Sequence, residues 1–91
     1  MAAEPHLQPE GLANVVKRLR RIEGQVRGIQ RMCEQGRPCG EVLTQMNATV
    51  KALESAAATV LREYLEVVAT DIAQGRVRDP NEISELLRKF A

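Results

Sequence analysis

The sequence predicts an all-α protein in which two long helices form a hairpin and a short C-terminal helix follows. Apolar residues recur at alternating intervals of three and four positions over two long stretches, which is the spacing of one helix face, and no stretch has the two-residue alternation of a strand. The 91 residues suffice for one small domain with only 2% aromatic side chains, so the core of a single chain is small. We therefore expect two hairpins to pair as an antiparallel four-helix-bundle dimer.

The first predicted helix begins near Pro9-Glu10, because proline suits a first helical turn. Its apolar seam comprises Leu12, Val15, Leu19, Ile22, Val26, Ile29 and Cys33. The segment Gln35-Gly36-Arg37-Pro38 ends this pattern. Residues 1–8 are expected to form a flexible leader, and residues 9–91 a single helical domain.

The second predicted helix runs from about residue 39 to 74, which is about 54 Å at ~1.5 Å per residue. Its seam comprises Cys39, Leu43, Met46, Val50, Leu53, Ala57, Val60, Tyr64, Val67 and Asp71. The first helix is too short to cover all of it. We therefore expect the apolar residues from Ala56 to Ile72 to require the third helix or another chain.

The third predicted helix begins after Asp79, which can cap it, with Pro80 in its first turn and Glu82 two residues later. Gly75 suits the end of the second helix. The apolar positions of this short amphipathic helix are Ile83, Leu86, Leu87 and Phe90.

Positive charge is concentrated in the first helix and the turn after it. Residues 17–37 contain seven basic residues and two acidic ones. The basic residues that recur at helical spacing, with one from the second helix, are Lys17, Arg18, Arg20, Arg21, Arg27, Arg31 and Lys51. Such a face is often only solvated, but it also suits an anionic partner such as double-stranded DNA. Gly24 and Gly28 disfavour a helix interior, so we expect them to permit close approach of another helix or a phosphate.

The two cysteines do not suggest a secreted disulfide framework, since residues 1–10 lack the apolar core of a secretion signal. No apolar run approaches the length that spans a bilayer, so no membrane partner is expected. These features predict a cytoplasmic protein.

Two motifs resemble the copper-sensitive operon repressor (CsoR) family. The first runs from Arg18 to Ile29 and the second from Arg37 to Gln45, and the resemblance extends over roughly residues 12–90. It implies a small helical bacterial repressor, with dimers stacked into a tetramer whose flat face binds operator DNA. Branches of the family sense copper, nickel or cobalt, formaldehyde, or sulfane sulfur. The resemblance places a sensing cysteine at Cys39 and an operator-binding arginine at Arg18, while Ser55 replaces a basic residue of the family.

The same resemblance indicates that the copper ligand set is incomplete. A histidine and a cysteine of the family's copper branch correspond to Tyr64 and Val68 here, and neither replacement suits copper(I). The remaining candidate metal ligands are Cys39 and His6, so we predict no certain cofactor and no copper site. Tyr64 either packs in the core or places its hydroxyl beside Cys39 of a partner chain. Glu85 matches an acidic residue that couples the family's sensor histidine to DNA affinity, but without that histidine it is expected to be solvated.

The two thiols are expected to flank the turn between the long helices. A disulfide requires Cα atoms roughly 4.4–6.8 Å apart, which the base of a hairpin can provide. Arg37 and the N-terminus of the second helix would favour a reactive thiolate at Cys39. Cys33 can instead be a packing residue, because a free cysteine behaves as a small hydrophobic side chain.

The resulting hypothesis is a DNA-binding repressor, not an enzyme, that assembles as a homodimer or homotetramer. Its operator affinity would be controlled at Cys39 by sulfane sulfur, an aldehyde, an oxidant or a metal other than copper. The alternative is a helical-hairpin interaction protein that self-associates but has lost sensing and DNA binding. Salt-dependent binding to duplex DNA distinguishes the two.

Overall fold

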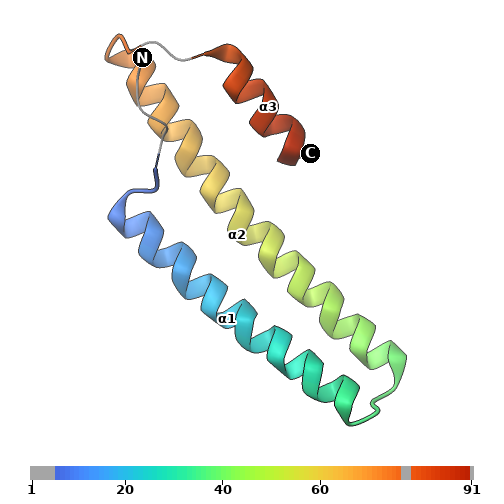
Figure 1. Ribbon diagram of the computed structural model, residues 1–91. Helices are drawn as coiled ribbons and strands as arrows, with labels where there is room; N and C mark the ends of the chain where they lie inside the picture. The colour runs from blue at the N-terminus through green and yellow to red at the C-terminus, as the bar shows by residue number, and fades with distance from the viewer. Residues whose placement is uncertain (1–5, 77–78, 91) are drawn as a thin grey trace.

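The computed structural model describes residues 6–76 and 79–90, and these residues form three helices (Figure 1). Helix α1 spans Pro9–Glu34, α2 spans Cys39–Ala73 and α3 spans Pro80–Phe90. The first two run antiparallel as a long hairpin, and the molecule measures 57 × 26 × 15 Å. The predicted all-α class and the order of a long hairpin followed by a short helix are confirmed.

The helix ends lie where the local sequence places them. Gly36 adopts a positive φ of 69°, which lets the N–H of Arg37 reach back to the carbonyl oxygen of Met32 at 3.0 Å and closes α1. Gly75, with a φ of 80°, ends α2 in the same way. The carboxylate of Asp79 accepts the N–H of Asn81 at 3.0 Å, as expected of a residue that caps α3.

The core lies between α1 and α2. On α2 the buried residues are Ala56, Thr59, Val68 and Asp71, and only Asp71 among them belongs to the predicted seam. On α1 the core uses half of the predicted seam. Val15, Ile22 and Ile29 of α1 are buried, whereas the alternating seam residues Leu12, Leu19 and Val26 are 42–48% exposed. A heptad seam has two rows, and one neighbouring helix covers one of them. The uncovered side, which we call the apolar face, comprises Leu12, Leu19, Val26, Leu43, Met46, Val50 and Leu53.

The segment from Ala56 to Ile72, which was expected to require the third helix or another chain, is partly buried within one chain. Ala56 and Val68 are 2% and 4% exposed within one chain, and only Leu65 and Ile72 of this segment are large exposed apolar residues. The uncovered apolar residues of α2 are concentrated instead in its first half, from Leu43 to Leu53. Leu43, Met46, Val50 and Leu53 include both rows of the predicted seam, so the buried side of α2 is displaced from that seam.

The open end of the hairpin contains a close contact between α1 and α2. The carboxylate of Glu63 occupies the space that a Cβ atom of Gly11 would fill. One of its oxygens, Oε2, is buried and has no hydrogen-bond partner among the described residues. Gly11 lies in the first turn of α1, where the helix dipole favours a negative charge, and this offsets part of the cost of burying the carboxylate.

Helix α3 lies beside the second half of α2, on the side away from α1 (Figure 1). The hydroxyl of Tyr64 donates a hydrogen bond to Glu82 Oε1 across this contact at 3.4 Å. Leu87 and Phe90 remain 42% and 47% exposed. None of the described helices is both long enough and apolar enough to cross a membrane.

Candidate nucleic-acid interface and thiol sites

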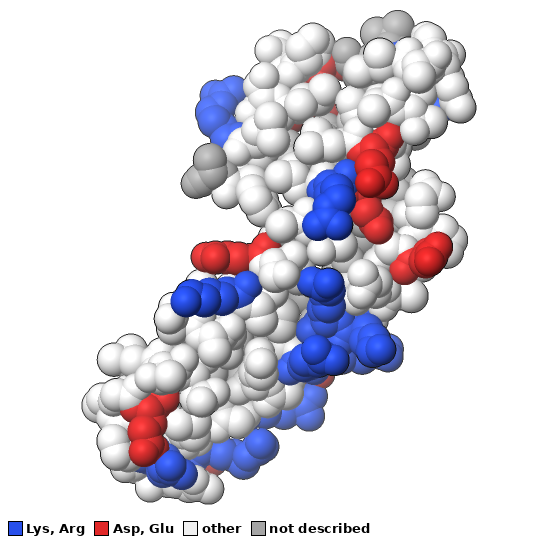
Figure 2. All heavy atoms as spheres, turned by 180° about the vertical axis from the view of Figure 1, so that it is seen from behind, with Lys and Arg blue, Asp and Glu red and all other residues white. Residues whose placement is uncertain are grey.

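The basic residues singled out in the sequence lie along α1 and on the middle of α2. Figure 2 shows lysine and arginine side chains gathered over the middle of the hairpin. Arg18 is half-buried, and the other six are exposed: Lys17, Arg20, Arg21, Arg27, Arg31 and Lys51. They differ in their surroundings, because Arg27 pairs with a carboxylate and three others line a common hollow.

Three of these cations surround one concave site between α1 and α2. This site, which we call the basic hollow, has a volume of about 420 Å³ and is lined by Asn14, Lys17, Arg18, Arg21, Ile22, Ala52 and Ser55. No carboxylate lines it. Nη1 of Arg18 donates a hydrogen bond to Oγ of Ser55 at 3.2 Å, which joins the two helices across the hollow.

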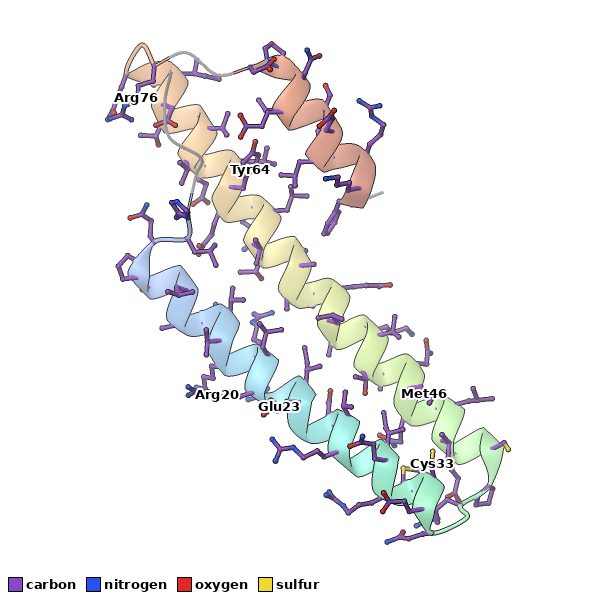
Figure 3. All side chains as sticks on the ribbon, viewed as in Figure 1. Arg20, Glu23, Cys33, Met46, Tyr64 and Arg76 are labelled. Carbon is purple, nitrogen blue, oxygen red and sulfur yellow. The ribbon has the colours of Figure 1, made fainter. Side chains whose placement is uncertain are left out.

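The remaining cations of α1 point elsewhere. Arg27 forms an ion pair with Glu23 at 2.6 Å, and both side chains are more than 60% exposed, so this pair adds little stability but neutralises charge locally. Figure 3 shows Arg20 directed away from α2. In the part of the chain that the structure describes, the ion pairs involve Arg27, Arg37 and Arg76, and none of the three cations of the basic hollow.

The two helical glycines do not mark a close approach within the chain. A Cβ atom added to Gly24 would meet nothing within 4 Å, and one added to Gly28 would meet only Nη2 of Arg31 at 3.8 Å. Any contact that requires these glycines therefore has to involve another molecule.

The basic hollow and the apolar face lie on opposite sides of the hairpin. On α1, Leu19 precedes the buried Ile22 by three residues and Arg21 precedes it by one. At 100° per residue these two side chains fall on opposite flanks of Ile22. The hairpin can therefore use one side for an anionic partner and the other for apolar packing.

Cys33 and Cys39 are both free and exposed, on either side of the turn that joins α1 to α2. Cys33 lies in an apolar groove of about 620 Å³ lined by Val26, Ile29, Gln30, Cys33, Glu34, Met46, Thr49 and Val50 (Figure 3). Cys39 is the first residue of α2 and does not line this groove. The two thiols thus lie in different surroundings.

The charge expected beside Cys39 is partly engaged elsewhere. The Arg37 guanidinium forms an ion pair with Glu41 at 2.7 Å and donates a second hydrogen bond to the same carboxylate at 3.0 Å. Arg37 therefore does not supply the unshared positive charge that the sequence suggested. Cys39 itself is exposed and is the first residue of α2, so its thiol lies at the N-terminus of that helix.

Tyr64 lies far from Cys39 of the same chain. The 25 residues of α2 that separate them correspond to about 37 Å at ~1.5 Å per residue. A pairing of these two side chains therefore requires a second chain. Within one chain, Tyr64 is half-buried and contacts α3 through Glu82, which the sequence analysis considered only as part of the start of that helix. Glu85 is exposed, and it lines a shallow hollow together with Tyr64 and Glu82.

The described residues of one chain do not form a metal site. Nowhere in residues 6–76 and 79–90 do three His, Cys, Asp or Glu side chains gather in a way that would hold a metal ion. His6 precedes the start of α1, whereas Cys39 follows its far end, so the structure does not bring these two candidate ligands together. Val68, at the position of the family's second cysteine, is buried at 4% exposure.

Comparison with known proteins identifies related sequences. Residues 12–89 match a family described as metal-sensitive transcriptional repressors. The copper-sensing transcriptional repressor RicR of Mycobacterium tuberculosis is 51% identical over 63 residues. These residues cover 68% of this chain and 66% of RicR, so the match spans just under two thirds of the length of RicR. The copper-sensing transcriptional repressor CsoR of Bacillus subtilis is 38% identical over 76 residues, covering 84% of this chain and 74% of that protein.

Solved structures of two regulators share the fold. The copper-sensing repressor CsoR with Cu(I) from Geobacillus thermodenitrificans superposes with a TM-score of 0.83 and 34% identity, covering 94% of this chain and 92% of that one. The nickel-responsive transcriptional regulator InrS superposes with a TM-score of 0.76 and 32% identity, covering 100% and 99%.

Proposed function

Because the chain belongs to the family of metal-sensitive transcriptional repressors, we propose that it is a DNA-binding repressor that works as a homodimer or homotetramer. The observation that carries the proposal is the basic hollow. Its three cations face solvent without a carboxylate in the lining, and such residues neutralise DNA phosphates and release counterions. The exposed apolar face on the opposite side of the hairpin supports self-association, since large contiguous apolar patches commonly mark protein interfaces.

We further propose that operator affinity is controlled at Cys39. This thiol is exposed at a helix N-terminus, where a reagent can reach it. The named relatives sense copper or nickel, so metal ions belong among the inducers to be tested. The presence of Tyr64 and Val68 at the positions of two copper ligands favours sulfane sulfur, an aldehyde, an oxidant or a different metal over copper. In a dimer, Tyr64 of one chain would approach Cys39 of the other.

The DNA-binding part is tested with the reduced full-length chain and duplex DNA, using fluorescence anisotropy over a series of salt concentrations. Arg18→Ala and Lys17→Ala should each weaken binding and lower the slope of log K against log salt by about 0.9, the value for one lost phosphate contact. Lys89→Ala on α3 removes the same charge outside the hollow and serves as the control. Unchanged affinity for both hollow variants would exclude this surface as the DNA site.

The sensing part uses the same assay after treatment with persulfide, formaldehyde, an oxidant, Cu(I) or Zn(II), with the intact mass recorded each time. The inducer should release DNA from the wild-type chain and leave a mass change or a bound metal. The alternative function, an interaction protein without DNA binding, predicts no salt-dependent affinity for duplex DNA in any of these states.

A further inference from the structure

The geometry points to Ser55 as a residue that positions Arg18 for DNA: we propose that the basic hollow seats one backbone phosphate, with the Arg18 guanidinium held in place by the Ser55 hydroxyl. This inference rests on the proposed DNA-binding function. It gives α2 a direct role, because Ser55 and Ala52 of this helix line the same hollow as the three cations of α1.

The contact with Ser55 fixes one edge of the guanidinium. Nη1 of Arg18 uses one N–H to reach Ser55 Oγ at 3.2 Å, and a guanidinium carries four further N–H groups that can bind phosphate oxygens. Arg18 is half-buried, while Lys17 and Arg21 beside it are exposed. A long side chain that is already held loses less conformational freedom when it binds a ligand. The Arg18 side chain is therefore the most conformationally restricted of the three cations in the hollow.

The hydroxyl of Ser55 can serve both partners at once. It accepts the hydrogen bond from Arg18, and it carries a proton that it can donate to a phosphate oxygen. Lys17 and Arg21 flank the same hollow and add positive charge, and the Asn14 amide offers further donors. Ile22 and Ala52 supply the apolar part of the lining, which strengthens the polar contacts beside it by excluding water. Together these groups suit a phosphate of a DNA backbone that crosses the hairpin.

The test compares Ser55→Ala, Ser55→Thr and the control Ser84→Ala, an exposed serine on α3, in the anisotropy assay with duplex DNA. Ser55→Ala should weaken binding about three- to tenfold, which corresponds to one ordinary hydrogen bond. The salt slope should stay unchanged because no charge is removed. Ser55→Thr keeps a hydroxyl and should restore most of the affinity. Alanine is a good helix former, so helicity measured by circular dichroism should not fall.

A double-substitution cycle separates positioning from direct contact. If Ser55 acts mainly through Arg18, Ser55→Ala should cost less than about twofold in a chain that already carries Arg18→Ala. An equal loss in both backgrounds would overturn the positioning role. Wild-type binding together with identical affinities for Ser55→Ala and Ser84→Ala would overturn the inference as a whole. Absence of salt-dependent binding by the wild-type chain would instead overturn the proposed function on which the inference rests.

Discussion

Truncation of Leu53 should weaken self-association through the apolar face. Leu53 is 50% exposed in one chain, and full burial of a leucine side chain stabilises by roughly 1.5–3 kcal/mol. Covering the exposed half in a dimer is therefore worth about 1 kcal/mol or slightly more per chain. A symmetric dimer buries two copies, which gives about 2–3 kcal/mol. Leu53→Ala should raise the dimer dissociation constant about 30- to 150-fold.

Sedimentation equilibrium over a range of concentrations measures this constant directly. The control is Leu87→Ala, because Leu87 is a leucine of α3 with a comparable exposed fraction of 42% that lies outside the apolar face. The control should change the constant less than about threefold if the apolar face forms the dimer contact. A wild-type chain that stays monomeric, or equal constants for the two variants, would refute this assignment of the interface.

Three further predictions concern the thiols, copper and the helix glycines. Cys39→Ala should bind DNA like the wild type but no longer respond to the inducer, whereas Cys33→Ala should still be modified but stop at a single-cysteine adduct. Intact mass and anisotropy test this, and a full response by Cys39→Ala would contradict it. The Tyr64→His, Val68→Cys double variant should acquire tight Cu(I) binding in a chelator competition, and equally tight binding by the wild type would contradict the incomplete ligand set. Gly24→Ala should raise the free energy of unfolding by up to about 1 kcal/mol, because alanine favours a helix interior and its Cβ atom would meet no other atom within 4 Å. Gly36→Ala should lower the free energy of unfolding by about 1–2 kcal/mol, because residue 36 has a positive φ that alanine disfavours. Thermal denaturation checks both signs.

The helix boundaries were predictable because their causes are local. Pro9 at the start of α1, Gly36 and Gly75 at the two helix ends, and Asp79 before α3 each act on a backbone within a few residues. The same locality explains why the hairpin itself could be inferred, since a short turn between two long amphipathic helices makes them antiparallel neighbours.

The division of the α1 seam into a buried and an exposed row was not predictable from spacing alone. Leu19 and Ile22 occupy equivalent positions in the apolar repeat, yet one is 42% exposed and the other 8%. Which row faces α2 depends on how the two helices are rotated about their axes. The two rows of the repeat are equally apolar, so the sequence does not determine that rotation.

The polar contacts between helices were also missed, for a different reason. Arg18 and Ser55 are 37 residues apart, and Tyr64 and Glu82 are 18 apart. Neither pair has a fixed spacing in the sequence, because each depends on the register between two helices. The sequence analysis noted Ser55 only as the replacement of a basic residue of the family, and nothing in the sequence shows that its hydroxyl accepts a hydrogen bond from Arg18.

The position of Ser55 bears on how a thiol could control DNA affinity. Ser55 follows Cys39 by 16 residues, or about 24 Å along α2, so an adduct on the thiol does not reach the basic hollow of the same chain. Under the proposed function, control within one chain would pass through a change in how α1 and α2 lie against each other. The basic hollow is sensitive to that change because its central hydrogen bond joins Arg18 on one helix to Ser55 on the other. The apolar face is built from the same two helices. A shift of α2 at Cys39 would therefore change both the packing of the partner chain on the apolar face and the geometry of the proposed phosphate site in the basic hollow.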